Sequence, residues 1–194
     1  GFGRTGEIFA SQNEKVGPDF LCLAKGLTGG YLPMAATLTT REVFDVFLGE
    51  YDEFKTFFHG HSYTGNQLGG AAALASFDIL QGSTSRKARS LLRQSLCNEL
   101  ASLWQLKHVG DVRQVGLVAG VELVADWRTR EAFPLKAQAG IRVCDAMARR
   151  GVLTRPIGNV VPILPPYCTT ENQVRRIVNV LQESIVEVLG GESA

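Results

Sequence analysis

The sequence has little net charge, few aromatic residues and no long hydrophobic run, and each absence excludes a class of protein. Among 194 residues, 20 Lys and Arg balance 19 Asp and Glu, which leaves a net charge of +1. No basic surface therefore favours nucleic acid or an anionic membrane. No stretch suits a membrane span or a charged secretory leader. With 45% hydrophobic residues, we expect a globular cytoplasmic protein whose partner is a small molecule or another chain.

The cysteines and histidines also lack the spacing of a metal or disulfide framework. Cys22, Cys97, Cys144 and Cys168 form no C-x-x-C pair, so we expect buried, reduced thiols. His59 and His61 have no third histidine or carboxylate near them in sequence, and we predict no metal site.

The first half of the chain alternates strand and helix patterns. Residues 20–24 form a short apolar run typical of a buried strand, and residues 34–39 predict a second strand. Thr40 can cap a short helix that runs to Phe47. Residues 68–80 form an Ala-rich helix, and the Gly-Ser-Thr-Ser stretch at 82–85 interrupts the chain. An α/β layer over residues 1–82 follows from this alternation.

The second half, residues 83–194, has an α+β pattern and is predicted as a separate domain. Its expected helices cover residues 88–103 and 137–150, the latter ending at Gly151. Within 112–124, apolar residues around Gly116 and Gly120 predict two tightly joined strands, and further strands are expected at 152–155 and 160–164. Thr170 begins a capping box, and the helix after it places six apolar side chains on one face: Val174, Ile177, Val178, Leu181, Ile185 and Val188.

The opening residues 1–6 match G-x-G-x-x-G, the fingerprint of a dinucleotide-binding turn. That fingerprint needs a strand before it, a helix directly after it and an acidic residue at the end of the next strand. Here the helix is doubtful, and Asp19 precedes the apolar run instead of ending it. We therefore reject a dinucleotide site.

Lys25 follows the apolar run 20–24 and precedes a glycine-rich loop, Gly-Leu-Thr-Gly-Gly at 26–30. An amine at the end of a buried strand is partly desolvated, which favours its neutral, nucleophilic form. Such a lysine can condense with an aldehyde cofactor such as pyridoxal phosphate. The alternative is a lysine that reaches solvent from a strand end, and position alone leaves both open.

Two further segments carry candidate binding groups. Residues 59–66 place hydroxyls and flexible backbone before a helix, where unpaired N–H groups favour an anion such as a phosphate. Arg155, between an expected strand and Pro156, could bind a substrate carboxylate with two hydrogen bonds. It could equally be an ordinary surface arginine.

Together these motifs resemble the class III aminotransferases. The resemblance is carried by residues 1–6 (GFGRTG), by Pro18-Asp19 leading into 23–30 (LAKGLTGG), and by 59–66 (HGHSYTGN). Within that class, residues 54–61, 155–158 and 165–167 most resemble the biotin-synthesis enzymes. Those enzymes transfer an amino group to 8-amino-7-oxononanoate with S-adenosylmethionine as donor.

The resemblance implies a fold type I pyridoxal-phosphate transferase, with the C-terminal part of the large domain at 1–82 and the small domain at 83–194. It makes Lys25 the residue that binds the cofactor covalently and moves the proton. It implies that His61 and Ser62 bind the cofactor phosphate across a homodimer boundary. Gly60 and Arg155 would contact substrate, and Arg4 is a looser candidate.

The resemblance also implies that functional groups lie upstream of residue 1. The Asp that pairs with the pyridinium nitrogen and the aromatic substrate pocket have no counterpart in these residues. We therefore expect the 194 residues alone to be weak or inactive. The alternatives are another class III aminotransferase or aminomutase, and a non-catalytic dimerisation fragment.

Overall fold

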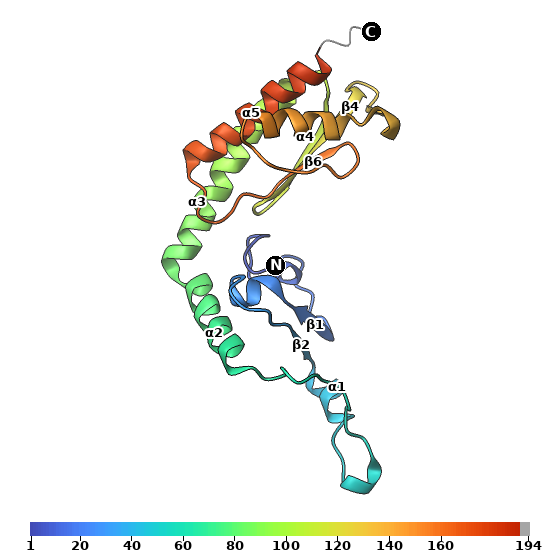
Figure 1. The fold of residues 1–194 in the computed structure, drawn as a ribbon, viewed down its shortest axis with the longest axis vertical. Coiled ribbons are helices and arrows are strands. Elements are labelled where there is room, and N and C mark those ends of the chain that lie inside the picture. Colours follow the sequence, from blue (N-terminus) through green and yellow to red (C-terminus); the bar gives the residue numbers. More distant parts are fainter. Residues whose placement is uncertain (191–194) are drawn as a thin grey trace. The chain divides into compact units, whose positions relative to one another are not determined.

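The computed structural model describes residues 1–190, which divide into two compact units (Figure 1). Unit 1 comprises Gly1–Gly3 and Glu7–Arg86, and unit 2 comprises Arg4–Gly6 and the chain from Lys87 onward. Residues Arg4–Gly6 of the opening glycine motif therefore belong to unit 2, although they lie at the start of the sequence. The predicted division at residue 82 into a large-domain part and a small domain stays a prediction.

Unit 1 is built from short elements. A single turn of 3-10 helix, η1 (Ala10–Gln12), precedes strand β1 (Phe20–Leu23), and a second, η2 (Lys25–Thr28), follows it. Strand β2 (Ala36–Thr39) pairs antiparallel with β1, Phe20 opposite Thr39. After β2 come helix α1 (Arg41–Asp45), η3 (Tyr51–Glu53) and helix α2 (Gln67–Gln81). The predicted Thr40 cap is confirmed, because its hydroxyl accepts from the Val43 N–H at 3.4 Å.

The expectation of a buried strand at 20–24 is wrong for the residues described. β1 alternates exposed and half-buried residues, and Phe20 is 58% exposed. The physical reason is that β1 has a single neighbour, β2, and these two strands form a sheet of their own. The apolar run was correctly predicted as a strand, but its pattern did not reveal what would cover it.

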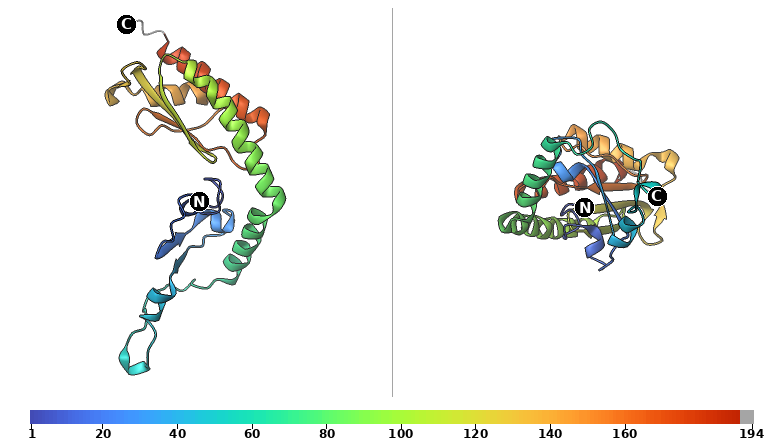
Figure 2. Two further views of the ribbon diagram at one scale, coloured as in Figure 1. Left: turned by 180° about the vertical axis from the view of Figure 1, so that it is seen from behind. Right: turned by 90° about the horizontal axis from the view of Figure 1, so that it is seen from below.

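Unit 2 has a four-stranded antiparallel sheet and three long helices. Helix α3 (Ser83–Leu100) continues into η4 (Ala101–Gln105), followed by strands β3 (Val109–Val115), β4 (Val118–Asp126) and β5 (Glu131–Ala132). Next come η5 (Leu135–Ala137), helix α4 (Ala139–Arg149), strand β6 (Val160–Ile163) and helix α5 (Glu171–Leu189). β4 pairs with β3, β5 and β6, and Figure 2 shows α3, α4 and α5 grouped around this sheet.

One hydrophobic core joins the sheet of unit 2 to its helices. β4 contributes Val121 and Leu123, and α5 contributes Leu181 and Ile185, all at most 1% exposed. Leu96 of α3 and Met147 of α4 belong to the same cluster. The alternation of apolar residues along β4 and the three-to-four spacing along the helices bring these side chains to one interior.

Most predictions for the second half are confirmed. The tight strand pair turns at Gly116, which has a positive φ of 61°, and Gly151 after α4 has a φ of 81°. Thr170 forms the capping box with Gln173. The strand expected at 152–155 is wrong: residues 152–156 have no regular structure, and an isolated bridge between Ile157 and Val160 follows them.

The cysteines are free, as predicted, but only Cys144 is buried. Burial raises the pKa of the Cys144 thiol to about 11. Cys22 lies on the uncovered strand β1, Cys97 on the outer face of α3, and Cys168 in the loop before α5. Their apolar neighbours in sequence therefore did not indicate burial. Within residues 1–190, no helix has the length and apolar character needed to cross a bilayer.

Candidate functional site

Lys25 is the first residue of η2, directly after β1. Its φ of 53° is in the left-handed region, which is uncommon for a residue with a side chain. The side chain is exposed, so the expected partial desolvation is not met by the described residues. Within residues 1–190 the amine has no hydrogen bond or ion pair. Lys25 thus has an exposed side chain without a partner among these residues, and its backbone is held in an unusual conformation.

The loop after Lys25 has open space at Gly30 but not at Gly26. Gly29 and Gly30 both have positive φ, and a Cβ built on Gly30 would meet no atom within 4 Å. A Cβ built on Gly26, next to Lys25, would lie 3.0 Å from the Phe2 ring. The Ser76 hydroxyl of α2 donates to the Gly26 carbonyl at 3.3 Å, so α2 and Phe2 both support this part of the loop.

Gly60, His61 and Ser62 lie in an exposed segment that leads into α2. The His61 backbone N–H donates to the Thr64 hydroxyl at 3.0 Å, and His61 Nδ1 accepts from the Tyr63 N–H at 3.1 Å. Of the two predicted phosphate ligands, only Ser62 keeps both its hydroxyl and its N–H free of partners in the described part of the chain. His61 can donate from Nε2, since Nδ1 acts as an acceptor.

Helix α2 links these two groups of residues. Its N-cap, Asn66, accepts from the Gly69 N–H at 2.9 Å and follows the 60–62 segment directly. Further along, α2 packs on η2, which carries Lys25. No hydrogen bond among residues 1–190 joins Lys25 to residues 60–62, so α2 supports both but does not by itself bring them together.

Arg155 lies in unit 2 and is exposed. The chain around it runs beside β6: the Thr154 hydroxyl donates to the Pro162 carbonyl at 2.8 Å, and Ile157 and Val160 exchange backbone hydrogen bonds at 2.8 and 3.0 Å. This hairpin therefore places Arg155 alongside the middle of β6. Its guanidinium has no partner within residues 1–190.

A glycine of α4 permits this placement of Arg155. A Cβ built on Gly140 would lie 2.8 Å from Pro156 Cβ and would overlap the carbonyl oxygen of Gly158. The turn after Arg155 thus packs directly on the α4 backbone. Sequence reasoning did not identify Gly140, because nothing in a helical pattern distinguishes a glycine required by a neighbouring loop.

Arg4 belongs to unit 2 and is held at three points. Its backbone carbonyl accepts from the Leu117 N–H at 2.6 Å, and its guanidinium donates to the Pro165 carbonyl. The guanidinium carbon also lies 4.7 Å from the centroid of the Tyr167 ring. Pro165 lies two residues beyond the end of β6, and Arg155 lies alongside that strand. Arg4 thus contacts the segment that follows β6.

Arg89 and Tyr167 were not predicted as site residues. Arg89, on α3, is 8% exposed, and its guanidinium carbon lies 5.6 Å from the Tyr167 ring centroid. Burial raises the pKa of Tyr167, an effect that the charges of Arg4 and Arg89 partly offset. The Pro-Pro-Tyr motif was visible in the sequence, but Arg89 lies among the leucines of a helix with no signal of its own.

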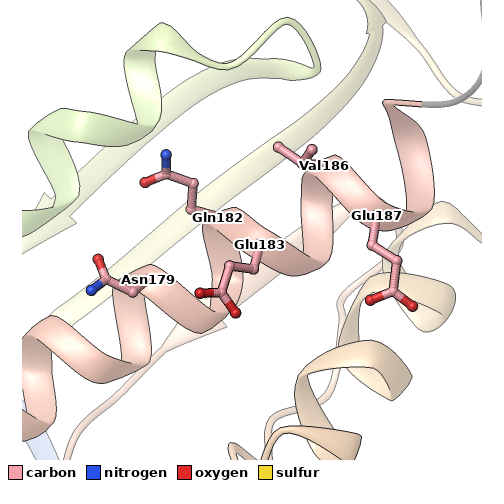
Figure 3. A pocket seen from close by; sticks show the side chains of 5 residues that line it. All are labelled: Asn179, Gln182, Glu183, Val186 and Glu187. Atoms are coloured by element: carbon pink, nitrogen blue, oxygen red, sulfur yellow. The ribbon is translucent and has the colours of Figure 1, made fainter.

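A shallow pocket on α5 is lined by none of the predicted site residues. It is lined by Asn179, Gln182, Glu183, Val186 and Glu187, which project from one helix (Figure 3). Its carboxylates are engaged, since Glu183 and Glu187 pair with Arg150 at 3.4 and 2.6 Å. Hydrogen bonds from Arg150 and Arg149 lower the pKa of Glu187. Within residues 1–190, no group of three His, Cys, Asp or Glu could hold a metal.

Residues 1–185 match the family model described as aminotransferase class-III. The chain is 49% identical over 187 residues to an adenosylmethionine-8-amino-7-oxononanoate aminotransferase of Anoxybacillus flavithermus, covering 96% of this chain and 41% of that protein. A Geobacter sulfurreducens protein of the same name is 48% identical, with 98% and 42% covered. The chain thus spans about two fifths of the length of the curated relatives it matches.

Solved structures agree with these relatives. The crystal structure of the Methanocaldococcus jannaschii protein of that name has a TM-score of 0.90 at 46% identity, covering 97% of this chain and 44% of that one. A PMP-bound aminotransferase from Vibrio fluvialis has a TM-score of 0.89 at 24% identity, which shows the fold alone. The prediction of a fold type I transferase is confirmed by these likenesses.

Proposed function

This chain belongs to the class III aminotransferases, and from that premise we propose that it is part of a longer enzyme of biotin synthesis. That enzyme would transfer an amino group from S-adenosylmethionine to 8-amino-7-oxononanoate and release 7,8-diaminononanoate. The observation that carries the proposal is 45–49% identity, over nearly the whole chain, to relatives named for this reaction. A solved (S)-selective ω-transaminase from Thermomicrobium roseum is 30% identical, so the biotin enzyme is favoured over that alternative.

Class III aminotransferases depend on pyridoxal phosphate, and the residues of unit 1 fit this cofactor. Lys25 offers an exposed amine that has no partner within residues 1–190, as a covalent attachment site needs, and the loop after it has open space at Gly30. Ser62 and His61 precede the first turn of α2, where helix N–H groups favour a phosphate. When bound, the cofactor supplies an electron sink for the carbanion formed at the substrate carbon.

Each candidate site residue then has a defined role in the reaction. Lys25 holds the cofactor and afterwards moves a proton between the substrate carbon and C4′ of the cofactor in both halves of the reaction. Arg155, exposed and without a partner, binds the carboxylate of the oxononanoate with its planar guanidinium. Gly60 contacts the substrate through its backbone, and Arg4 is a second candidate for substrate contact.

The proposal includes a homodimer in which His61 and Ser62 bind the phosphate held by the other subunit. It also includes weak or absent activity of the 194 residues alone, because the carboxylate that would pair with the pyridinium nitrogen is not among them. A homodimer agrees with the exposed position of the 60–62 segment, because the Ser62 hydroxyl and N–H have no partner within residues 1–190 and can meet a second chain.

The test compares two lysines of unit 1 in the full-length protein. Lys25→Ala should abolish cofactor absorbance and lower 7,8-diaminononanoate formation by at least about 10³-fold, since proton transfer alone contributes about 10²–10⁴. Lys15→Ala is the matched control, because Lys15 is also exposed and has a φ of 55°. It should leave both readouts unchanged.

The outcome also separates the alternatives. Activity with other amino acceptors, and none with 8-amino-7-oxononanoate, would indicate another class III aminotransferase. Intramolecular migration of the amino group would indicate an aminomutase. A protein that dimerises but takes up no pyridoxal phosphate would contradict the proposal and favour a non-catalytic role.

A further inference from the structure

The ring of Tyr167 in unit 2 has two guanidinium groups against it. The guanidinium carbons of Arg4 and Arg89 lie 4.7 and 5.6 Å from its centroid. Arg89 is 8% exposed and has no carboxylate partner within the described residues. A buried cation normally needs such a partner. The aromatic ring is therefore its main stabilising contact, and Arg89 in turn packs the ring in place.

The guanidinium of Arg4 carries five N–H donors, and within residues 1–190 its one hydrogen-bond acceptor is the Pro165 carbonyl. One edge of Arg4 donates to the Pro165 carbonyl, which fixes the rotation of the group. The backbone of Arg4 is fixed as well, by the hydrogen bond from Leu117 and by the close approach of Gly116. The remaining N–H donors of Arg4 are therefore held in a fixed direction, close to the segment that follows β6.

We propose that Tyr167 and Arg89 are positioning residues that preorganise Arg4 for an anionic group of the substrate. The inference rests on the proposed function, since that function supplies a substrate with a carboxylate. Preorganisation lowers the entropy cost of binding, so its loss should weaken substrate binding more than it slows the chemical steps. The expected signature is a rise in KM for the acceptor with little change in kcat.

The experiment uses the full-length holoenzyme with two substitutions at one position. Tyr167→Leu removes the ring and should raise KM for 8-amino-7-oxononanoate about tenfold, the size of a partly desolvated cation–π contact. Tyr167→Phe keeps the ring and should stay within about threefold of the parent enzyme. Equal KM values for both variants, or an unchanged KM in Tyr167→Leu, would overturn the proposal.

A second pair of variants tests Arg89 on its own helix. Arg89→Met keeps much of the side-chain volume but loses the cation, and should raise KM in the same direction as Tyr167→Leu. Arg93→Met is the control, because Arg93 is an exposed arginine of α3, one turn further along. A purely structural role for Arg89 would lower the melting temperature and leave the KM of the folded enzyme unchanged, which would contradict positioning.

A double-mutant cycle measured by thermal unfolding tests the contact between Arg4 and Tyr167 without any substrate. If Arg4 and Tyr167 interact, the loss in Tm of Arg4→Met combined with Tyr167→Leu should be smaller than the sum of the single losses. Additive losses would overturn the proposal even in an active enzyme. Failure of the wild type to convert 8-amino-7-oxononanoate would instead count against the proposed function. The double-mutant cycle would still test the contact between Arg4 and Tyr167 in that case.

Discussion

Unit 1 leaves its large apolar side chains in solvent, whereas unit 2 buries them. Every buried hydrophobic residue among residues 1–190 except Leu80 belongs to unit 2. In unit 1, Tyr51 is 96% exposed, Tyr31 87% and Phe54 75%. Exposed apolar surface on this scale marks an interaction surface more than a finished domain. The unit with the proposed cofactor lysine is thus the one that lacks a core of its own.

This difference in burial between the units shows which residues of the proposed site are positioned without further protein around them. Within unit 2, hydrogen bonds hold Arg4 and also the backbone around Arg155, through Thr154. Lys25 and Ser62 lie on exposed segments and have no partner within residues 1–190. We infer that the substrate-side arginines are positioned by unit 2 itself. The cofactor-side residues need further protein around them, which agrees with a chain that spans about two fifths of its relatives.

The largest effect is expected from deleting a core side chain. Leu181→Ala, at a fully buried position of α5, should lower the free energy of unfolding of unit 2 by about 2–5 kcal/mol. Leu74→Ala on α2, where the side chain is 70% exposed, should change it by less than about 0.5 kcal/mol. Denaturant unfolding of the 194-residue chain measures both.

Equal changes in the free energy of unfolding for Leu181→Ala and Leu74→Ala in that chain would contradict the contrast between the two units. The same Leu74 substitution in the full-length protein sharpens it further. A cost there of about 2 kcal/mol or more would mean that the exposed face of α2 is covered by other parts of the enzyme.

The sequence was sufficient to predict the elements whose signals are local. The capping box of Thr170 with Gln173 and the tightly joined strand pair within 112–124 depend on neighbouring residues only, and both were predicted correctly. The choice of Gly116 over Gly120 for the turn was not predicted. The burial of β1 was mispredicted, because an apolar strand does not reveal which layer covers it. Arg89 and Gly140 were missed, because their roles depend on Tyr167 and Gly158, which are distant in sequence.

An intermediate effect is expected from adding a methyl group to a helical glycine. Gly140→Ala should cost about 1–3 kcal/mol, since the new Cβ would overlap the Gly158 carbonyl. It should also raise KM for the acceptor in the full-length enzyme, because the turn after Arg155 must move. Gly70→Ala is the control in unit 1: no atom lies within 4 Å of the added Cβ, so helix propensity should stabilise α2 by about 0.5–1 kcal/mol.

Destabilisation by Gly140→Ala together with stabilisation by Gly70→Ala would support the contrast between α4, which is packed against a turn at Gly140, and α2, which is uncovered at Gly70. Destabilisation by Gly70→Ala in the full-length enzyme alone would place another segment against α2. A Gly140 variant with normal stability and normal KM would contradict the placement of the Arg155 turn.

The smallest change in the free energy of unfolding is expected when one of two helix-capping threonines, Thr170 or Thr40, is replaced by alanine. Thr170 accepts from the Gln173 N–H at 3.3 Å and begins a 19-residue helix packed on the core, while Thr40 caps the five-residue α1. Thr170→Ala should lower the free energy of unfolding by about 1 kcal/mol. Thr40→Ala should have less than half that effect in the 194-residue chain, because a helix of five residues without a buried face adds little to the cooperative unfolding of unit 2. Thermal unfolding followed by circular dichroism measures both, and equal losses would mean that α1 unfolds together with the core.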